Sequence, residues 1–158
     1  MILQKLSTKK MILQVGVKIL LKNSEGKYLL ARRNPKKYPD VGPKWDIIGG
    51  RINPGSSLIE NLRREIKEEV GLDYQGQPKL MAAQDIMVPG RTELAAEPLQ
   101  TEKHVVRLTF TGEIDGEPQI DEESLEAKWF SAEELKNVNK SELDKYFNEL
   151  VEQGTISL

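Results

Sequence analysis

The chain contains no cysteine and a single histidine, His104. Without cysteine there can be no disulfide bond, no zinc–thiolate site and no cysteine nucleophile. One histidine cannot build a multi-histidine metal site alone, and His104, at the start of an apolar segment, suits a structural role better than a catalytic one. These absences exclude several kinds of metal, redox and thiol chemistry before any motif is considered.

Long hydrophobic runs are also missing. No apolar stretch approaches the roughly 20 residues that are needed to cross a bilayer. Residues 1–20 carry scattered lysines but no continuous apolar segment followed by a small-residue cleavage site, so we expect no signal peptide. We therefore expect a cytoplasmic protein that has no membrane partner.

Charge of either sign is nearly balanced, with a formal net charge of -2 over 158 residues. A general binder of nucleic-acid polymers needs a basic stripe that displaces counterions, and this balance argues against one. A small phosphorylated ligand needs only a few local cations and is not excluded. With 38% hydrophobic and 30% charged residues, the sequence predicts one soluble globular domain over residues 1–158.

Apolar periodicity and turn residues predict a mixed α/β fold. Strands are expected at 11–21, 27–33, 79–88, 104–114 and 127–130, with a hairpin joining the first two across the turn at 23–26. Helices are expected at 57–70, 131–135 and 140–153. Two long loops, 34–44 and 89–103, remain, and loops of this length in compact domains often carry function.

The segment 57–70 gives the strongest helical signal in the chain. Ser57 and Glu60 have the spacing of a capping box, and Gly71 follows where a left-handed terminating residue is expected. An apolar stripe recurs every four residues and comprises Leu58, Leu62, Ile66 and Val70. One face of this helix should therefore pack on a core.

Three carboxylates crowd one side of the same helix. At about 100° per residue, Glu65, Glu68 and Glu69 fall within about 100° of one another, beside the apolar stripe. Two unit charges ~5 Å apart repel by about 3 kcal/mol at an effective dielectric of 20. A divalent cation such as Mg²⁺, which prefers oxygen ligands and shares its shell with phosphates, would turn this repulsion into affinity. On its own the cluster is more typical of a solvated acidic face than of a metal site.

The surrounding sequence extends this cluster into a motif. Residues 49–72 read GGRINPGSSLIENLRREIKEEVGL. They resemble the Nudix box, which is Gly, five residues, Glu, seven residues, then Arg-Glu-apolar-x-Glu-Glu-x-Gly-apolar. Gly50 supplies the first glycine, and residues 64–72 match the second part at every position. The strand order around the box is similar to the Nudix α/β/α sandwich with a mixed β-sheet, which extends the resemblance to most of the chain.

The resemblance implies a hydrolase that uses Mg²⁺, with Mn²⁺ as a possible substitute, to cleave a phosphoanhydride bond in a nucleoside diphosphate derivative. It implies metal ligands at Glu65, Glu68, Glu69 and the carbonyl of Gly50, and catalytic roles for Glu65, Glu68 and Arg64. Arg64 would orient a glutamate through a charge-assisted hydrogen bond. The acidic segment 121–126 is similar to the family's acidic loop ahead of its last strand, and Glu123 is its best candidate for a catalytic base. A solvated acidic loop is the alternative.

Two residues depart from the family pattern. Ser56 stands where the box has its first glutamate, so the site has one carboxylate fewer than usual. Either Ser56 and Ser57 simply cap the helix, or metal affinity, substrate choice or activity has changed. Glu60, one turn on, points away from Glu65. Ile48 stands where many relatives have proline, which changes only backbone stiffness.

The sequence leaves the ligand open among nucleoside triphosphates, ADP-ribose and sugar nucleotides. Arg32 and Arg51 are the candidate phosphate-binding residues within a basic region ahead of the box, although such cations also keep surfaces soluble. An inactive nucleotide-binding or regulatory module is the main alternative, and a protein-interaction domain without a ligand is the third. An oligomer is possible, and specificity should lie in the loops 34–44 and 89–103.

Overall fold

The computed structural model describes residues 11–39, 42–88 and 102–158. Within these residues a seven-stranded sheet forms the centre of the molecule, with the strand order β3-β2-β1-β6-β5, while β4 pairs with β1 and β7 with β2. The strands are β1 (Ile12–Lys22), β2 (Tyr28–Arg33), β3 (Trp45–Asp46), β4 (Ile48–Arg51), β5 (Lys79–Val88), β6 (Lys103–Glu113) and β7 (Ser124–Phe130).

Strand β1 is the hub of the sheet. It runs parallel to β6 along its whole length and antiparallel to β2 and to β4. Its apolar residues alternate between the two faces, with Val17, Ile19 and Leu21 in one core cluster and Leu20 in the other. Because both faces are covered, this strand reads as a nearly continuous apolar run.

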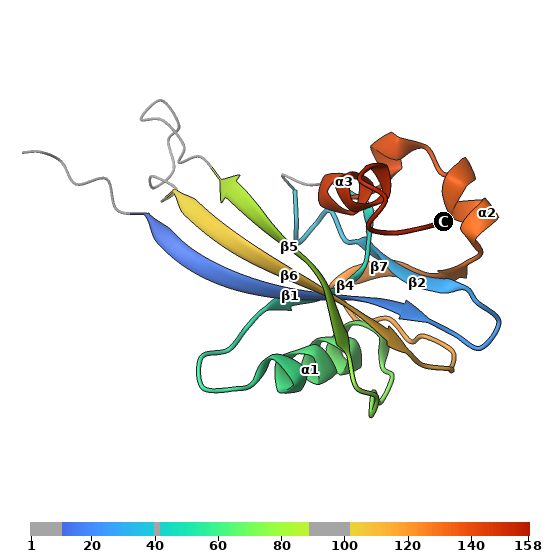
Figure 1. Ribbon diagram of the computed structural model, residues 1–158, viewed down its shortest axis with the longest axis horizontal. Helices are drawn as coiled ribbons and strands as arrows, with labels where there is room; N and C mark the ends of the chain where they lie inside the picture. The colour runs from blue at the N-terminus through green and yellow to red at the C-terminus, as the bar shows by residue number, and fades with distance from the viewer. Residues whose placement is uncertain (1–10, 40–41, 89–101) are drawn as a thin grey trace, which may run out of the picture.

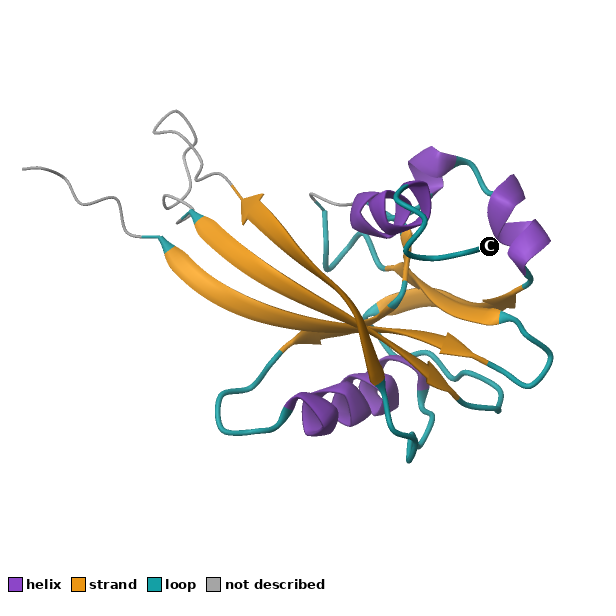
Figure 2. Ribbon diagram, in the orientation of Figure 1, coloured by secondary structure: helices purple, strands orange, loops and turns teal. Residues whose placement is uncertain are grey.

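Helices cover both faces of the sheet, which confirms the expected α/β/α sandwich with a mixed sheet (Figure 1; Figure 2). On one face α1 (Leu58–Val70) packs Leu62, Ile66 and Val70 into the first cluster. On the other face α2 (Ala132–Asn137) and α3 (Lys145–Glu152) contribute Leu135, Phe147 and Leu150 to the second. The figures show β1, β6 and β5 extending beyond these layers at one end.

The ends of α1 follow the sequence closely. Ser57 is the N-cap, its side chain accepts from the amide of Glu60, and the Glu60 carboxylate accepts from the amide of Ser57. Gly71 ends the helix in the left-handed conformation with a φ of 70°. The predicted capping box and C-terminal glycine are both confirmed, so the helix carrying the Nudix-box carboxylates begins and ends as expected.

Two of the expected elements differ in the structure. The single helix expected at 140–153 is wrong, because a 3₁₀ turn at Lys140–Glu142 is separated from α3 by Leu143 and Asp144. Leu143 is buried and bridges to Trp45, and the Asp144 side chain caps α3. Tertiary contacts thus override a continuous helical pattern. The last strand also begins at Ser124, so half of the acidic segment 121–126 lies in β7.

None of the helices in the described part of the chain is long and apolar enough to span a membrane. Most of the long loop expected at 89–103 lies outside the described residues, as do residues 40–41 of the loop 34–44.

Candidate active site

The acidic side of α1 packs against β4 through a close backbone approach at Gly50. A Cβ atom at Gly50 would lie 2.7 Å from Oε1 of Glu65, so any side chain at this position would displace the carboxylate. Glu65 is only 8% exposed, although a glutamate side chain in water is ordinarily charged. The box glycine therefore lets a glutamate reach the interior edge of the sheet beside the backbone of β4.

Arg64 holds two of the three clustered carboxylates. Its guanidinium lies 2.8 Å from Oε1 of Glu65 and donates to Oε2 of Glu68 at 3.0 Å. It also donates to the carbonyl of Arg51 and to the side chain of Asn61. Burial raises the pKa of Glu65, and the positive charge of Arg64 opposes that effect. The orienting role that the resemblance gave to Arg64 thus has a geometric basis, while its part in catalysis stays a prediction.

Glu69 is the most perturbed carboxyl group of α1. Burial raises its pKa to about 8, Lys18 opposes the shift, and the charges of Glu65 and Asp46 add to it. The amide of Gly49 donates to its Oε1 at 3.3 Å. This carboxyl group is costly to ionise because it is buried beside two other carboxylates. A cation bound there would stabilise its charged form, so the surroundings of Glu69 strongly favour a cation.

A small cavity of about 170 Å³ places Glu69 and Glu123 in the same space. Glu123 lies just before β7, 54 positions from Glu69 in sequence, and the two come from different layers of the sandwich. Tyr38 donates to Oε2 of Glu123 at 3.5 Å, and the Lys37 ammonium lies 3.7 Å from Oε1. The acidic segment thus places one carboxylate, that of Glu123, in this cavity, and its role as a catalytic base stays a prediction.

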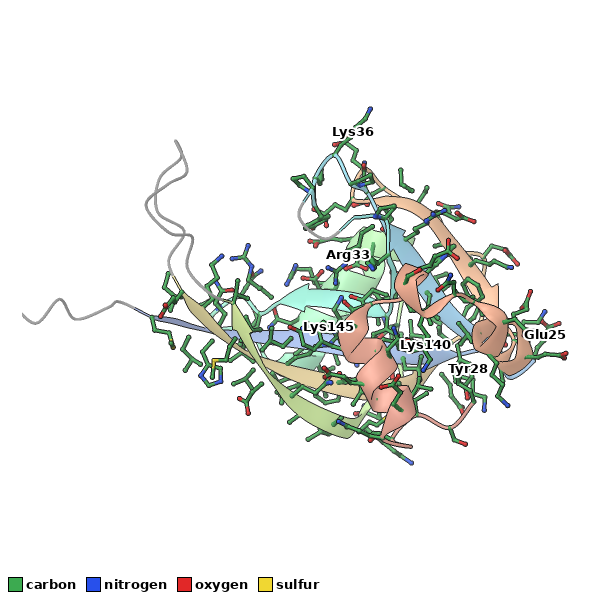
Figure 3. All side chains as sticks on the ribbon, turned by 90° about the horizontal axis from the view of Figure 1, so that it is seen from above. Glu25, Tyr28, Arg33, Lys36, Lys140 and Lys145 are labelled. Atoms are coloured by element: carbon green, nitrogen blue, oxygen red, sulfur yellow. The ribbon has the colours of Figure 1, made fainter. Side chains whose placement is uncertain are left out.

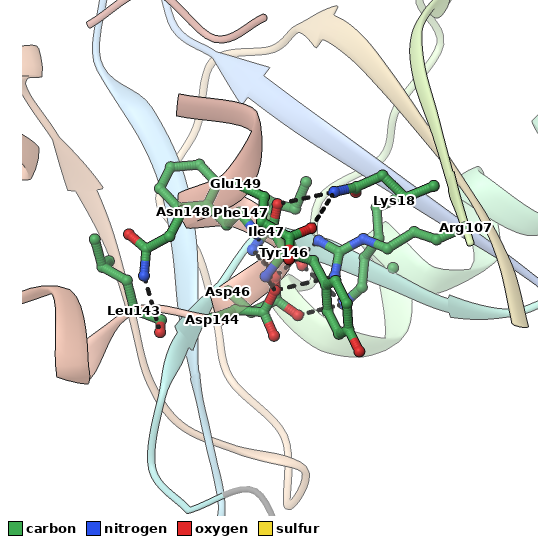
Figure 4. A network of polar contacts seen from close by, with 12 residues as sticks. Lys18, Asp46, Ile47, Arg107, Leu143, Asp144, Tyr146, Phe147, Asn148 and Glu149 are labelled. Atoms are coloured by element: carbon green, nitrogen blue, oxygen red, sulfur yellow. Dashed lines mark hydrogen bonds and ion pairs between the residues drawn. The ribbon is translucent and has the colours of Figure 1, made fainter. Parts of the chain in front are cut away.

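A buried ionic network forms the floor beside these carboxylates (Figure 4). The Asp46 carboxylate binds Lys18 at 2.8 Å and Arg107 at 3.2 Å, and also accepts from Arg33. Burial alone would raise the pKa of Asp46, but these three cations outweigh it and hold the pKa well below its usual range. Asp46 therefore stays ionised, and the cations are fixed in place.

Arg107 connects this network to α3. It is 3% exposed and donates to Oδ1 of Asp144 at 3.0 Å, in addition to its contact with Asp46. The same Asp144 oxygen accepts from the amides of Tyr146 and Phe147 and so caps α3. The start of the C-terminal helix is thereby tied to β6 in the middle of the sheet.

A second cavity, of about 510 Å³, opens beside Gly50 and over this network. Its lining combines an apolar wall with many cations. The cations are Lys18, Arg33, Lys44, Arg51, Arg107 and Lys145, and Val17, Ile86, Val88, Val105 and Tyr146 supply apolar or aromatic surface. Lys44, Arg51 and Lys145 have no carboxylate partner within the described ranges. Figure 3 shows Arg33 and Lys145 on the same side of the molecule. The cavity suits an anion with an aromatic or apolar part.

The two arginines proposed for substrate binding are placed differently. Arg51 lines the 510 Å³ cavity directly after Gly50. Arg32 lies outside both cavities, donates to the carbonyl of Pro43 and stacks 5.9 Å from the Trp45 ring, whereas its neighbour Arg33 lines both. Adjacent strand residues point to opposite faces, so the basic pair divides between the site and the surface.

Sequence reasoning missed most of the residues that shape the floor: Lys18, Asp46, Arg107, Asp144 and Tyr146. One signal was available for two of them. Lys18 and Arg107 are charged residues with apolar neighbours in the middle of two strands, and buried charges of this kind require partners. The partners themselves are far apart in sequence, and no spacing rule identifies them.

A divalent metal fits the chemistry of these donors. The α1 carboxylates and the Gly50 carbonyl offer only oxygen, which hard cations prefer, and the missing Cβ of Gly50 keeps the Glu65 carboxylate against the strand. In the conformation described for residues 11–39, 42–88 and 102–158, no three acidic or histidine side chains form a group that could hold an ion. Arg64 instead pairs with two of the carboxylates, as expected where like charges need a counter-charge.

A mixed sheet between helices, with an acidic helix beside a cavity lined by cations, defines an α/β/α sandwich protein. A model of the NUDIX domain matches residues 12–150, so the chain belongs to the Nudix family. By family it is a Nudix pyrophosphohydrolase, and the enzymes of this family act on nucleotide derivatives and generally use divalent metals.

Individual relatives agree with this assignment. The nucleoside triphosphatase NudI of Escherichia coli is 31% identical over 115 residues, which are 71% of this chain and 78% of NudI. The NAD-capped RNA hydrolase NudC of Stutzerimonas stutzeri is 29% identical over 71% of this chain, but over only 35% of NudC. The structure of the MutT protein from Methanosarcina mazei superposes with a TM-score of 0.72 at 26% identity, covering 91% of this chain and 94% of MutT.

Proposed function

We propose that this protein is a Mg²⁺-dependent hydrolase that cleaves the phosphoanhydride bond of a nucleoside diphosphate derivative. The observation that carries the proposal is the position of the α1 carboxylates. Glu69 shares a cavity with Glu123, and the adjoining cavity beside Gly50 is lined by cations. The candidate metal ligands and the candidate phosphate-binding cations thus adjoin the same short strand, β4.

Glu65, Glu68, Glu69 and the carbonyl of Gly50 would hold the metal. When bound, a divalent cation neutralises phosphate charge and lowers the pKa of a coordinated water. Arg64, which contacts both Glu65 and Glu68, holds these two carboxylates beside each other. Glu123, on the far wall of the 170 Å³ cavity, accepts the proton of the attacking water. The chain's own contribution is therefore positioning, charge stabilisation and one proton transfer.

Nucleoside triphosphates are the substrates that we expect to be hydrolysed fastest, ahead of ADP-ribose and sugar nucleotides. The cations Lys44, Arg51 and Lys145, which have no carboxylate partner in the described part of the chain, favour the ligand that carries the most negative charge. The nearby apolar wall and Tyr146 suit a base. The nucleoside triphosphatase name of the relative NudI supports the same class.

A panel of substrates tests the proposal. The protein is incubated with Mg²⁺ and, separately, with nucleoside triphosphates, ADP-ribose, sugar nucleotides and dinucleotides, and the released nucleotide and pyrophosphate are measured. We expect turnover of triphosphates, reduced by about 10²-fold or more in Glu68→Gln because a proposed metal ligand loses its charge. Glu133→Gln, an exposed glutamate on α2, is the matched control and should retain full activity.

The inactive binding module remains the second candidate, and Ser56 is the observation that favours it. A Nudix domain of NrtR from Shewanella oneidensis, whose structure is in complex with ADP ribose, has this fold with a TM-score of 0.63 at 18% identity, over 90% of this chain and 86% of the other. Binding of ADP-ribose or a triphosphate without turnover across the whole panel would favour this candidate over the hydrolase.

A further inference from the structure

A cavity of about 600 Å³ lies at the end of the sheet where β1 and β6 finish and β5 begins. It shares no lining residue with either cavity of the candidate active site. Lys22 lines it, four residues along β1 from Lys18, so the backbones at the two sites are about 13 Å apart. Neither the Nudix-box residues nor the basic cavity accounts for it.

The floor and one wall of this cavity are preformed. Leu20 and Met81, from β1 and β5, supply apolar floor, and Ile156 supplies apolar wall. The amide of Ile156 donates to the carbonyl of Leu150 at 3.0 Å, and Ile156 is 4% exposed. Tyr28, seen in Figure 3, donates to the carbonyl of Ser157 at 3.4 Å. The C-terminal segment is thus fixed across the sheet as a wall.

The charges at this cavity are positive on balance. Lys22 and Lys79 line it together with a single acidic residue, Glu113. Neither lysine has an ion-pair partner in the part of the chain that the structure describes, and the Lys22 ammonium instead lies 5.5 Å from the centre of the Tyr28 ring. Two ammonium groups beside an apolar floor are the complement of a molecule that joins an anionic group to an apolar body.

Tyr74 adds an independent observation. It is 2% exposed and lines the cavity, and its hydroxyl is buried without a hydrogen-bond partner among the described residues. The hydroxyl points at two glycines of the cavity wall, since a Cβ at Gly112 would lie 2.5 Å from it and one at Gly76 2.9 Å. A buried hydroxyl that lacks a partner destabilises the fold, and phenylalanine would fill the same space without that cost. Packing alone therefore does not explain why this residue is tyrosine.

We propose that this cavity is a second small-molecule site, separate from catalysis, that binds an organic anion. Lys22 and Lys79 attract the anionic group, which is a carboxylate or a phosphate monoester. The Tyr74 hydroxyl, which lies behind Gly76 and Gly112, donates to an oxygen of the bound molecule when these glycines move aside. Leu20 and Met81 contact the apolar body of that molecule. The inference does not depend on the proposed hydrolysis.

Titrations followed by amide NMR test the site on the full chain without added metal. The probes are benzoate, phenyl phosphate and the neutral analogue benzamide. We expect both anions to shift the amides of Gly112, Thr155 and Ser157, with benzamide at least about tenfold weaker because it lacks the charge. If only one anion shifts these amides, the class of anionic group is identified. The proposal is overturned if neither does, or if benzamide binds as well as the anions.

Variants separate a binding role from a structural one. Tyr74→Phe should leave the melting temperature unchanged or raised, yet weaken anion binding by about two- to tenfold, the usual worth of one hydrogen bond. The double variant Lys22→Gln/Lys79→Gln should weaken it at least about tenfold, whereas Lys136→Gln, on α2, is the matched control. All of these variants should retain the basal hydrolysis rate. An unchanged affinity in both Tyr74→Phe and the lysine double variant would show that the cavity binds no anion by these groups.

Discussion

Glu69 lies where α1 meets β4, and its carboxyl group is pulled in two directions by its surroundings. Burial, Glu65 and Asp46 favour its neutral form, while Lys18 and the amide of Gly49 favour its charged form. Its pKa of about 8 means that the metal-free protein holds a proton there at pH 7. Metal binding at this residue should therefore release a proton.

The first prediction concerns the stability of the metal-free protein. The folded pKa of Glu69 lies above its ordinary value of 4.5, so its protonated form is favoured by folding, and the free energy of unfolding should fall as pH rises from about 4.5 to about 8. Glu69→Gln should remove on the order of 4 kcal/mol of this fall. Urea denaturation in chelator at pH 5 and pH 8 measures it, and equal slopes for both proteins would contradict the pKa assignment.

The second prediction concerns Ser56. Ser57 alone caps α1, and Ser56 is exposed, with its carbonyl accepting from the Asn61 amide at 3.2 Å. Asn61 in turn accepts from Arg64, which links this position to the acidic cluster. Glu60 is engaged in the cap and does not replace the missing box glutamate.

Ser56→Glu should therefore raise Mg²⁺ affinity several-fold without disturbing the helix, because it adds a carboxylate while keeping the cap. Isothermal titration calorimetry measures the affinity, and Ser56→Gln controls for side-chain size. Equal Mg²⁺ affinity in wild type and Ser56→Glu would mean that the missing glutamate is not costly here.

At the scale of elements, α3 depends on a side chain that has two tasks. Asp144 caps the helix and also pairs with the nearly fully buried Arg107. The two tasks can be separated because asparagine caps helices as well as aspartate does but carries no charge.

We expect Asp144→Asn to lower the free energy of unfolding by about 1–3 kcal/mol through the weakened contact with Arg107. Asp144→Ala should lower it by about 1 kcal/mol more through the lost cap. Chemical denaturation at pH 7 compares them. Equal stability of the two variants would mean that the cap contributes nothing. If Asp144→Asn were as stable as wild type, the ion pair with Arg107 would not stabilise α3.

The elements also show how far local sequence patterns reach. The limits of α1, its cap and its terminal glycine were predicted because they depend on contacts within one turn. The break before α3 was not predicted, because Leu143 bridges to Trp45 and Asp144 pairs with Arg107. Both partners are distant in sequence. For the same reason the box carboxylates were found by their spacing, while Lys18 and Asp46 beneath them were not.

At the scale of the whole molecule, metal binding should stabilise the fold. A cation at a concentration one hundred times its dissociation constant adds about 2.7 kcal/mol to the free energy of unfolding. For a chain of this size, each kcal/mol raises the melting temperature by about 2–4 °C. Mg²⁺ or Mn²⁺ should therefore raise the melting temperature by several degrees, and Glu65→Gln/Glu69→Gln should abolish the rise. Differential scanning calorimetry measures the melting temperature, and NaCl at matched ionic strength is the control. An equal rise with NaCl would argue for a domain without a metal site.

The fold class was predictable from the sequence, but the pairing of the strands was not. Alternating apolar residues predicted the strands and the α/β class, and the box identified the family. The parallel pairing of β1 with β6 carries no local signal, because its register joins residues about ninety positions apart, such as Val17 and Leu108. The single domain over residues 1–158, the oligomeric state, the cytoplasmic location and the absence of nucleic-acid binding stay predictions.

This pairing has a consequence for biosynthesis. β1 leaves the ribosome about ninety residues ahead of its long parallel neighbour, which is complete only when Glu113 has been translated. Until then the central strand of the nascent chain has one open side, and the slow closure of so large a loop waits for β6 to emerge. Chaperones that bind extended apolar segments should therefore engage residues 12–22 during the interval between the emergence of β1 and that of β6.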